Sequence, residues 1–136
     1  MAKMTERMKE LFDKVGVAAL GTSTPDGVPN VVPVGAKKII DDETVLISDQ
    51  FLNKTLANMT SNPHVSLTYW EGREGYQLKG TVAIETSGKR FEETAEWIRA
   101  LGEKKGFPLK SKGAVILTIE KIFGVAPGPG AGKQLA

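Results

Sequence analysis

Residues 48–55, Ser-Asp-Gln-Phe-Leu-Asn-Lys-Thr, hold the side chains of this 136-residue chain that are best suited to bind an anion. They join a predicted buried strand to the predicted start of a short helix, with Asn53 as its N-cap. The free amides of a helix start carry a partial positive charge, and Lys54 adds a full charge beside the hydroxyls of Ser48 and Thr55. Lysine is unfavourable for the helix dipole at this end, and a bound anion would explain it. The alternative is a solvated lysine on a surface helix.

The C-terminal run Val-Ala-Pro-Gly-Pro-Gly-Ala-Gly-Lys is a second candidate, because it looks like a phosphate-binding loop. The pattern G-x-x-x-x-G-K-[ST] needs glycine where this chain has Pro127, and a hydroxyl where it has Gln134. Only two residues follow, so no helix can add its N-terminal amides. The run therefore predicts a flexible tail over residues 126–136. The alternative is a lid whose Gly-Pro hinge lays Lys133 over a ligand bound elsewhere.

The usual catalytic and metal-binding sets are missing from the chain. It has no cysteine, which excludes disulfides, thiolate metal sites and thiol catalysis. Its single histidine, His64, is interpreted as structural or solvated, and no metal site is expected. If the protein performs redox or group-transfer chemistry, a cofactor has to supply it.

Composition limits the partners. The net charge is only +2, and basic residues alternate with acidic ones, so no nucleic-acid partner is expected. No apolar stretch approaches the length of a membrane span, and a chain without cysteine suits the cytoplasm. We expect one domain over residues 1–125, followed by the Gly/Pro-rich tail over 126–136.

The elements that position these residues are predicted from periodicity and turn signals. A helix ends at Gly16, a short helix follows Asn53, and a longer helix is predicted to be capped by Ser87. Strands are expected at 16–23, 28–40, 44–48, 64–70, 76–86 and 113–125. Pro29 and Pro33 interrupt the second strand, which indicates an edge or a bulge. Tight turns between consecutive strands favour an antiparallel sheet, and about six such strands usually close into a barrel.

Three segments, in this order, resemble the FMN-binding split-barrel family, which includes pyridoxamine 5′-phosphate oxidase and small bacterial FMN-binding proteins. They are residues 16–34, residues 53–59 with Asn62-Pro63, and residues 75–82. The resemblance spans roughly residues 16–123. It implies a mostly β fold with flanking helices, a six-stranded antiparallel split β-barrel, and a homodimer with two FMN sites at its interface.

The resemblance also assigns roles to residues. Lys54 and Thr55 match the phosphate-binding pair, residues 32–35 match the strand that runs along the isoalloxazine ring, and Tyr76 and Gln77 match the strand that reaches the flavin from across the dimer. Ser48 and Gln50 lie beside the phosphate segment. The expected cofactor-binding residues are Val32, Pro33, Val34, Gly35, Ser48, Gln50, Asn53, Lys54, Thr55, Tyr76 and Gln77.

The chain also departs from the vitamin B6 oxidases of this family. Their basic residues in the strand before the phosphate site are reduced here to Lys37, and the Arg-Lys pair within the site is reduced to Lys54. Their C-terminal substrate-binding Trp and Arg have no counterpart in residues 131–136. The resemblance therefore implies an FMN-dependent oxidoreductase or electron carrier that acts on another small molecule. The alternatives are a flavin-binding module without turnover and a flavin-free dimeric barrel that serves as a scaffold or binds nucleic acid.

Overall fold

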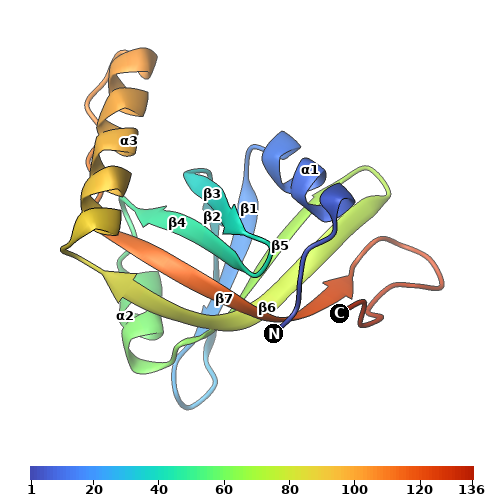
Figure 1. The fold of residues 1–136 in the computed structure, drawn as a ribbon. Helices are drawn as coiled ribbons and strands as arrows, with labels where there is room; N and C mark the ends of the chain where they lie inside the picture. The colour runs from blue at the N-terminus through green and yellow to red at the C-terminus, as the bar shows by residue number, and fades with distance from the viewer.

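Three helices and seven strands follow one another in a computed structural model that describes all of residues 1–136 (Figure 1). The helices are α1 (Glu6–Lys14), α2 (Lys54–Ser61) and α3 (Lys89–Lys105). The strands are β1 (Ala18–Ser23), β2 (Pro29–Val34), β3 (Lys37–Asp41), β4 (Thr44–Asp49), β5 (His64–Glu71), β6 (Glu74–Glu85) and β7 (Gly113–Gly124). The prediction of a mostly β fold with flanking helices is confirmed.

All seven strands form one antiparallel sheet in the spatial order β2-β1-β5-β6-β7-β4-β3. Strands β2 and β3 are consecutive in sequence but occupy opposite edges of this sheet. Only Gly35 and Ala36 separate them, and a link of this length spans at most roughly 11 Å. The sheet must therefore curl until its two edges approach each other at this link, which we call the seam. The result is a split barrel, as predicted, in which no ladder of hydrogen bonds joins β2 to β3.

The strand count differs from the sequence prediction. Residues 28–40 were expected to form one interrupted strand, whereas they form β2 and β3 on either side of the seam. The number of strands is therefore seven rather than six. The two prolines indicated an edge correctly, because Pro29 and Pro33 both lie on the edge strand β2, where a missing amide hydrogen costs no ladder bond.

Helix α1 covers one opening of the barrel and contributes to the main core. Thr5 caps its start by accepting a hydrogen bond from the Met8 amide. Phe12 is fully buried and meets the ring of Tyr69 edge-on, with centroids 5.3 Å apart. The Tyr69 hydroxyl donates to the Met8 carbonyl at 3.0 Å. The helix is thus fixed both by apolar packing and by a buried hydrogen bond.

Helix α3 stands at the opposite end of the sheet from the C-terminus (Figure 1). It begins at Lys89 with Gly88 at the N-cap position, so the prediction of Ser87 as the cap is wrong. Gly88 has a φ of 92°, a conformation that serine rarely adopts. None of the three helices is long and apolar enough to cross a membrane.

The C-terminal tail folds back on β7. Gln134 forms a bridge with Phe123, and the Gly124 amide donates to the Lys133 carbonyl at 2.9 Å. The Leu135 amide donates to the Ile122 carbonyl at 2.7 Å. The prediction of a flexible tail is therefore wrong, because these bonds fix its last residues against the sheet.

Candidate functional site

A groove of about 800 Å³ opens beside the seam. Its walls come from the end of β2, the loop between β4 and α2, the first turn of α2, and the end of α3. Nine of the residues predicted to bind a cofactor line it together: Val32, Pro33, Val34, Gly35, Ser48, Gln50, Asn53, Lys54 and Thr55. Residues far apart in the sequence thus face one cavity because the curled sheet brings the end of β2 close to α2 and the loop before it.

The first turn of α2 forms one end of the groove. Asn53 occupies the N-cap position, as predicted, but its side chain makes no capping hydrogen bond. The backbone amides of Lys54, Thr55 and Leu56 donate to no acceptor within the chain. The first turn contains no acidic side chain, so the helix dipole is unopposed there. Lys54 and Thr55 line the groove, so this end offers at least two free amides and one ammonium group to an anion.

Thr55 is held by a polar network beneath this turn. Its side chain is buried, with 2% of the residue exposed. Asn30 on β2 donates from Nδ2 to the Thr55 hydroxyl oxygen at 3.0 Å and to the Thr22 hydroxyl oxygen at 3.2 Å. Asn58 donates to the same Thr22 oxygen at 3.1 Å. Because Asn30 is a donor to Thr55, the Thr55 hydroxyl proton remains available to an acceptor outside this network.

The end of β2 supplies a flat apolar wall. Val32, Pro33 and Val34 are followed by Gly35, which has no side chain. A Cβ atom at this position would have only the Gly16 carbonyl oxygen near it. As an edge strand β2 has a side without ladder partners, so its backbone groups are free to face a ligand. A planar ring could stack along this wall with backbone groups at its rim.

The loop after β4 is held by the residues that precede the neighbouring strand β7. Ser48 donates to Ser111 at 2.8 Å, and Ser111 donates to the Gly113 carbonyl at 3.0 Å. Asp49 is 1% exposed and accepts from the Leu52 amide at 3.0 Å, with the Lys112 ammonium 3.6 Å away. The loop that carries Gln50 and Asn53 is therefore anchored at both ends.

All charged residues that line the groove are basic. Lys54 and Lys105 line it, and none of its 18 lining residues is acidic. Neither lysine forms an ion pair, whereas Lys112, just outside, is committed to Asp49 and to the Leu52 carbonyl. Two uncompensated cations in a partly apolar groove favour an anionic ligand with an apolar body.

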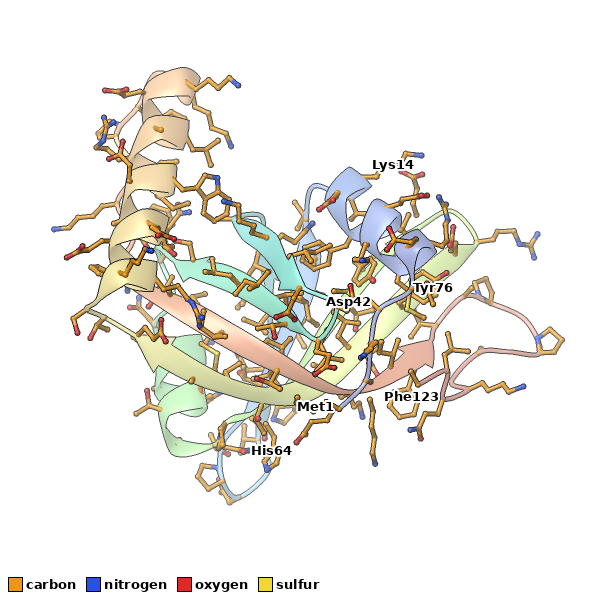
Figure 2. All side chains as sticks on the ribbon, viewed as in Figure 1. Met1, Lys14, Asp42, His64, Tyr76 and Phe123 are labelled. Carbon is orange, nitrogen blue, oxygen red and sulfur yellow. The ribbon has the colours of Figure 1, made fainter.

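Tyr76 and Gln77 do not line the groove of their own chain. The Tyr76 side chain lies beside α1 (Figure 2) and donates to Glu74 at 2.7 Å. Neighbouring residues of a strand face opposite sides, so Gln77 lies on the other face of the sheet, 3.4 Å from the Thr68 hydroxyl. His64 is exposed at the start of β5 and lies outside the groove (Figure 2).

Sequence reasoning missed two parts of this site. Asn30 was overlooked, although a polar residue flanked by valine and proline on a strand could have indicated a buried hydrogen bond. The wall from α3, which includes Lys105 and Phe107, was also missed. No local pattern predicts it, because it lies about 50 residues from Lys54 in the sequence and reaches the groove only through the tertiary fold. The predicted lid of Lys133 over this groove is wrong for a single chain, since no tail residue lines it.

A split barrel with an unpartnered helix start beside an apolar edge strand defines the fold class, and sequence comparison identifies the family. The chain belongs to the pyridoxamine 5′-phosphate oxidase family, whose model matches residues 4–126. An uncharacterized protein of Methanocaldococcus jannaschii is 38% identical over 139 residues, covering 100% of this chain and 90% of that protein.

Solved structures share the fold. HupZ of Group A Streptococcus is 26% identical, with a TM-score of 0.80 over 95% of this chain and 99% of that chain. An FMN-binding protein of Syntrophomonas wolfei is 20% identical, with a TM-score of 0.68 over 87% of this chain and 88% of that chain. HutZ, described as the haem storage protein of Vibrio cholerae, is 17% identical, with a TM-score of 0.62 over 89% of this chain and 94% of that chain.

Proposed function

We propose that the protein is an FMN-binding flavoprotein that works as an oxidoreductase or electron carrier on a small molecule. The observation that carries this proposal is the first turn of α2, where the unpartnered amides of Lys54 and Thr55 and the Lys54 side chain line one end of the groove. A phosphate with nearly two negative charges fits this end. Thr55 adds a hydroxyl donor that Asn30 orients.

The flavin ring is assigned to the wall formed by residues 32–35. This wall is apolar and belongs to an edge strand, so it offers both a stacking surface and free backbone groups. Ser48 and Gln50 lie between the two ends and would bind polar atoms of the ring or the ribityl chain. When bound, FMN supplies electron or hydride transfer, and the chain's own residues hold and orient it.

Haem is the competing ligand, because HutZ is described as a haem storage protein. Haem iron is usually held by histidine, cysteine, methionine or tyrosine. None of these residue types lines the groove, and the only histidine of the chain, His64, lies outside it. The chemistry of the groove therefore favours FMN over haem.

Titration of the ligand-free protein with FMN, riboflavin and haemin tests the proposal. We expect FMN to bind with quenching of flavin fluorescence, and riboflavin to bind more weakly because it lacks the phosphate. Tight binding of haemin and none of FMN would overturn the proposal. Anaerobic addition of NADH or NADPH to the FMN-loaded protein then separates an oxidoreductase from a module that only holds flavin, because only the former is reduced.

The homodimer is part of the same proposal. The outer face of β1 and β5 carries only small side chains along the rows that join Ala19 to Thr68 and Gly21 to Ser66. Val31 and Trp70 flank this flat area and are 67% and 56% exposed. A second copy packed on this face would cover both and would bring Gln77, which shares it, toward the partner's groove.

A further inference from the structure

The groove has a wall that the assignment of FMN leaves unused. Leu101, Lys105, Phe107 and Leu109 line it, and all four come from the last turn of α3 and the segment that follows. None of them belongs to the residues assigned to the phosphate or to the ring. The groove therefore has room and chemistry for a second ligand beside the flavin.

This wall has a fixed shape. Gly106 ends α3 in the left-handed conformation, with a φ of 83°, and the Phe107 amide donates back to the Gly102 carbonyl at 3.1 Å. A Cβ atom at Gly102 would lie 2.7 Å from both the Leu109 nitrogen and the Phe107 carbonyl oxygen, so the returning chain packs directly on the helix. The segment is thus a preformed wall rather than a free loop.

The next residues fasten this segment to the loop of the phosphate end. The Lys112 amide donates to the Asp49 carbonyl at 2.6 Å, and its ammonium donates to the Leu52 carbonyl at 3.0 Å. Ser111 accepts from Ser48. The second wall and the loop that leads to the phosphate end are therefore held in a constant relative position.

The chemistry of the second wall is apolar with one cation. Phe107 is 53% exposed although it is aromatic, and Leu101 and Leu109 are half-buried beside it. Lys105 forms no ion pair, in contrast to Arg99, two turns earlier, which contacts Glu96 and Glu103. Lysine near a helix C-terminus stabilises the helix dipole, but Lys104 does the same without lining the groove. Stabilisation of the helix dipole therefore does not account for the position of Lys105 in the groove.

We propose that this wall is the binding site for the second ligand of the groove, a small anionic molecule with a flat, apolar body. Lys105 contacts the anionic group, and Phe107 packs on the body. This inference rests on the proposed function, since it assigns the remaining wall only after FMN occupies the others. It specifies the substrate class for a flavoprotein whose substrate the sequence leaves open.

Calorimetric titration of the FMN-loaded protein with two matched probes, naphthalene-2-sulfonate and the neutral naphthalene-2-sulfonamide, tests it. We expect the wild type to bind the sulfonate about three- to tenfold more tightly than the sulfonamide. Lys105→Gln should abolish this preference, and the control Lys104→Gln should retain it. Phe107→Ala should weaken binding of both probes by a similar factor.

Several outcomes overturn the inference. Equal binding of the two probes to the wild type, or an unchanged preference for the sulfonate in Lys105→Gln, would show that Lys105 does not contact the anionic group. A loss of FMN affinity in Lys105→Gln as large as that in Lys54→Ala would assign Lys105 to the phosphate instead. A wild-type chain that binds no FMN overturns the proposed function and this inference with it, whereas FMN binding without discrimination between the probes overturns this inference alone.

Discussion

At the scale of single residues, Lys54 is the side chain on which the proposed phosphate site depends most. A hydrogen bond to a charged group contributes about 1.5–3 kcal/mol, so Lys54→Ala should weaken FMN binding by about 10–150-fold. Riboflavin has no phosphate, and its affinity should hardly change. Fluorescence titration with both flavins measures the two effects, with Lys89→Ala on α3 as the control, since Lys89 lies outside the groove. Equal losses for FMN and riboflavin would contradict the assignment.

Asn30 is expected to affect the proposed ligand only through its hydrogen bond to Thr55. Its amide group donates to both Thr22 and Thr55, and Thr22 also accepts from Asn58. Asn30→Ala therefore leaves the buried Thr55 hydroxyl without its donor and should lower the free energy of unfolding by about 1–3 kcal/mol. We also expect Asn30→Ala to reduce the affinity for FMN more than the affinity for riboflavin, because the Thr55 hydroxyl loses its orientation. Urea denaturation and the two titrations measure these effects. A variant that loses stability but binds both flavins normally would show that the network serves the fold alone.

The residues of the site differ in how far the sequence predicts them. Lys54 and Thr55 could be placed because a helix start after a buried strand is a local signal that neighbouring residues define. Asn30 and Lys105 could not, because each reaches the groove only when the sheet has curled and α3 has been positioned. Tyr76 and Gln77 are assigned by resemblance, and their role in a partner's groove stays a prediction. The resemblance assigns roles only to residues in the matched motifs, and none of these motifs includes the wall at the end of α3.

At the scale of elements, strands and helices were predicted best where apolar periodicity and turn residues agree. The buried run of β4 is an example. The division of residues 28–40 into two edge strands was not predictable, since Gly35 and Ala36 carry no strong turn signal. The cap of α3 was misplaced by one residue because serine is the commoner cap, while the observed conformation at Gly88 requires glycine.

Helix α1 is attached to the sheet by charge as well as by packing. Arg7 donates from Nε to Glu74 on β6 at 2.9 Å, and this hydrogen bond lowers the pKa of Glu74 from 4.5 to about 2. A carboxyl group with a lowered pKa in the folded state stabilises the protein above its ordinary pKa, and this contribution disappears as the pH falls toward the folded value. The stability of wild type relative to Glu74→Gln should therefore be constant above about pH 5.5 and should decrease between pH 4.5 and 2.

Urea denaturation at a series of pH values measures this difference. Because the pair is exposed, its contribution at neutral pH is expected to be modest and to decrease with added salt. Glu120→Gln on β7 is the control for a general effect of removing a carboxylate, because Glu120 is exposed and forms no ion pair. A wild-type advantage that increases on acidification would show the opposite sign of linkage and would contradict the role of Glu74.

At the scale of the whole molecule, the proposed dimer depends on the flat outer face of β1 and β5. Thr68 lies within this face, paired with Ala19 on one side and Gln77 on the other. Thr68→Arg places a long cation there without changing the core, so we expect a folded monomer with strongly reduced FMN affinity. Light scattering and flavin titration measure both properties, and Glu96→Arg on α3 is the control. A stable wild-type monomer that binds FMN tightly would contradict the arrangement.

The seam gives the molecule a place where it can open without unfolding. Val34 and Lys37 belong to opposite edges of the sheet, and the Ser48 amide, which donates to the Ala36 carbonyl at 2.9 Å, ties the short link between them to β4. Local opening of a barrel occurs where the fewest hydrogen bonds must break. The Ser48 amide should therefore exchange its proton for deuterium faster than the amides of the long β6–β7 ladder. If FMN occupies the groove, it bridges the two sides of the seam, and its binding should slow the exchange of this amide more than that of any amide in the ladder.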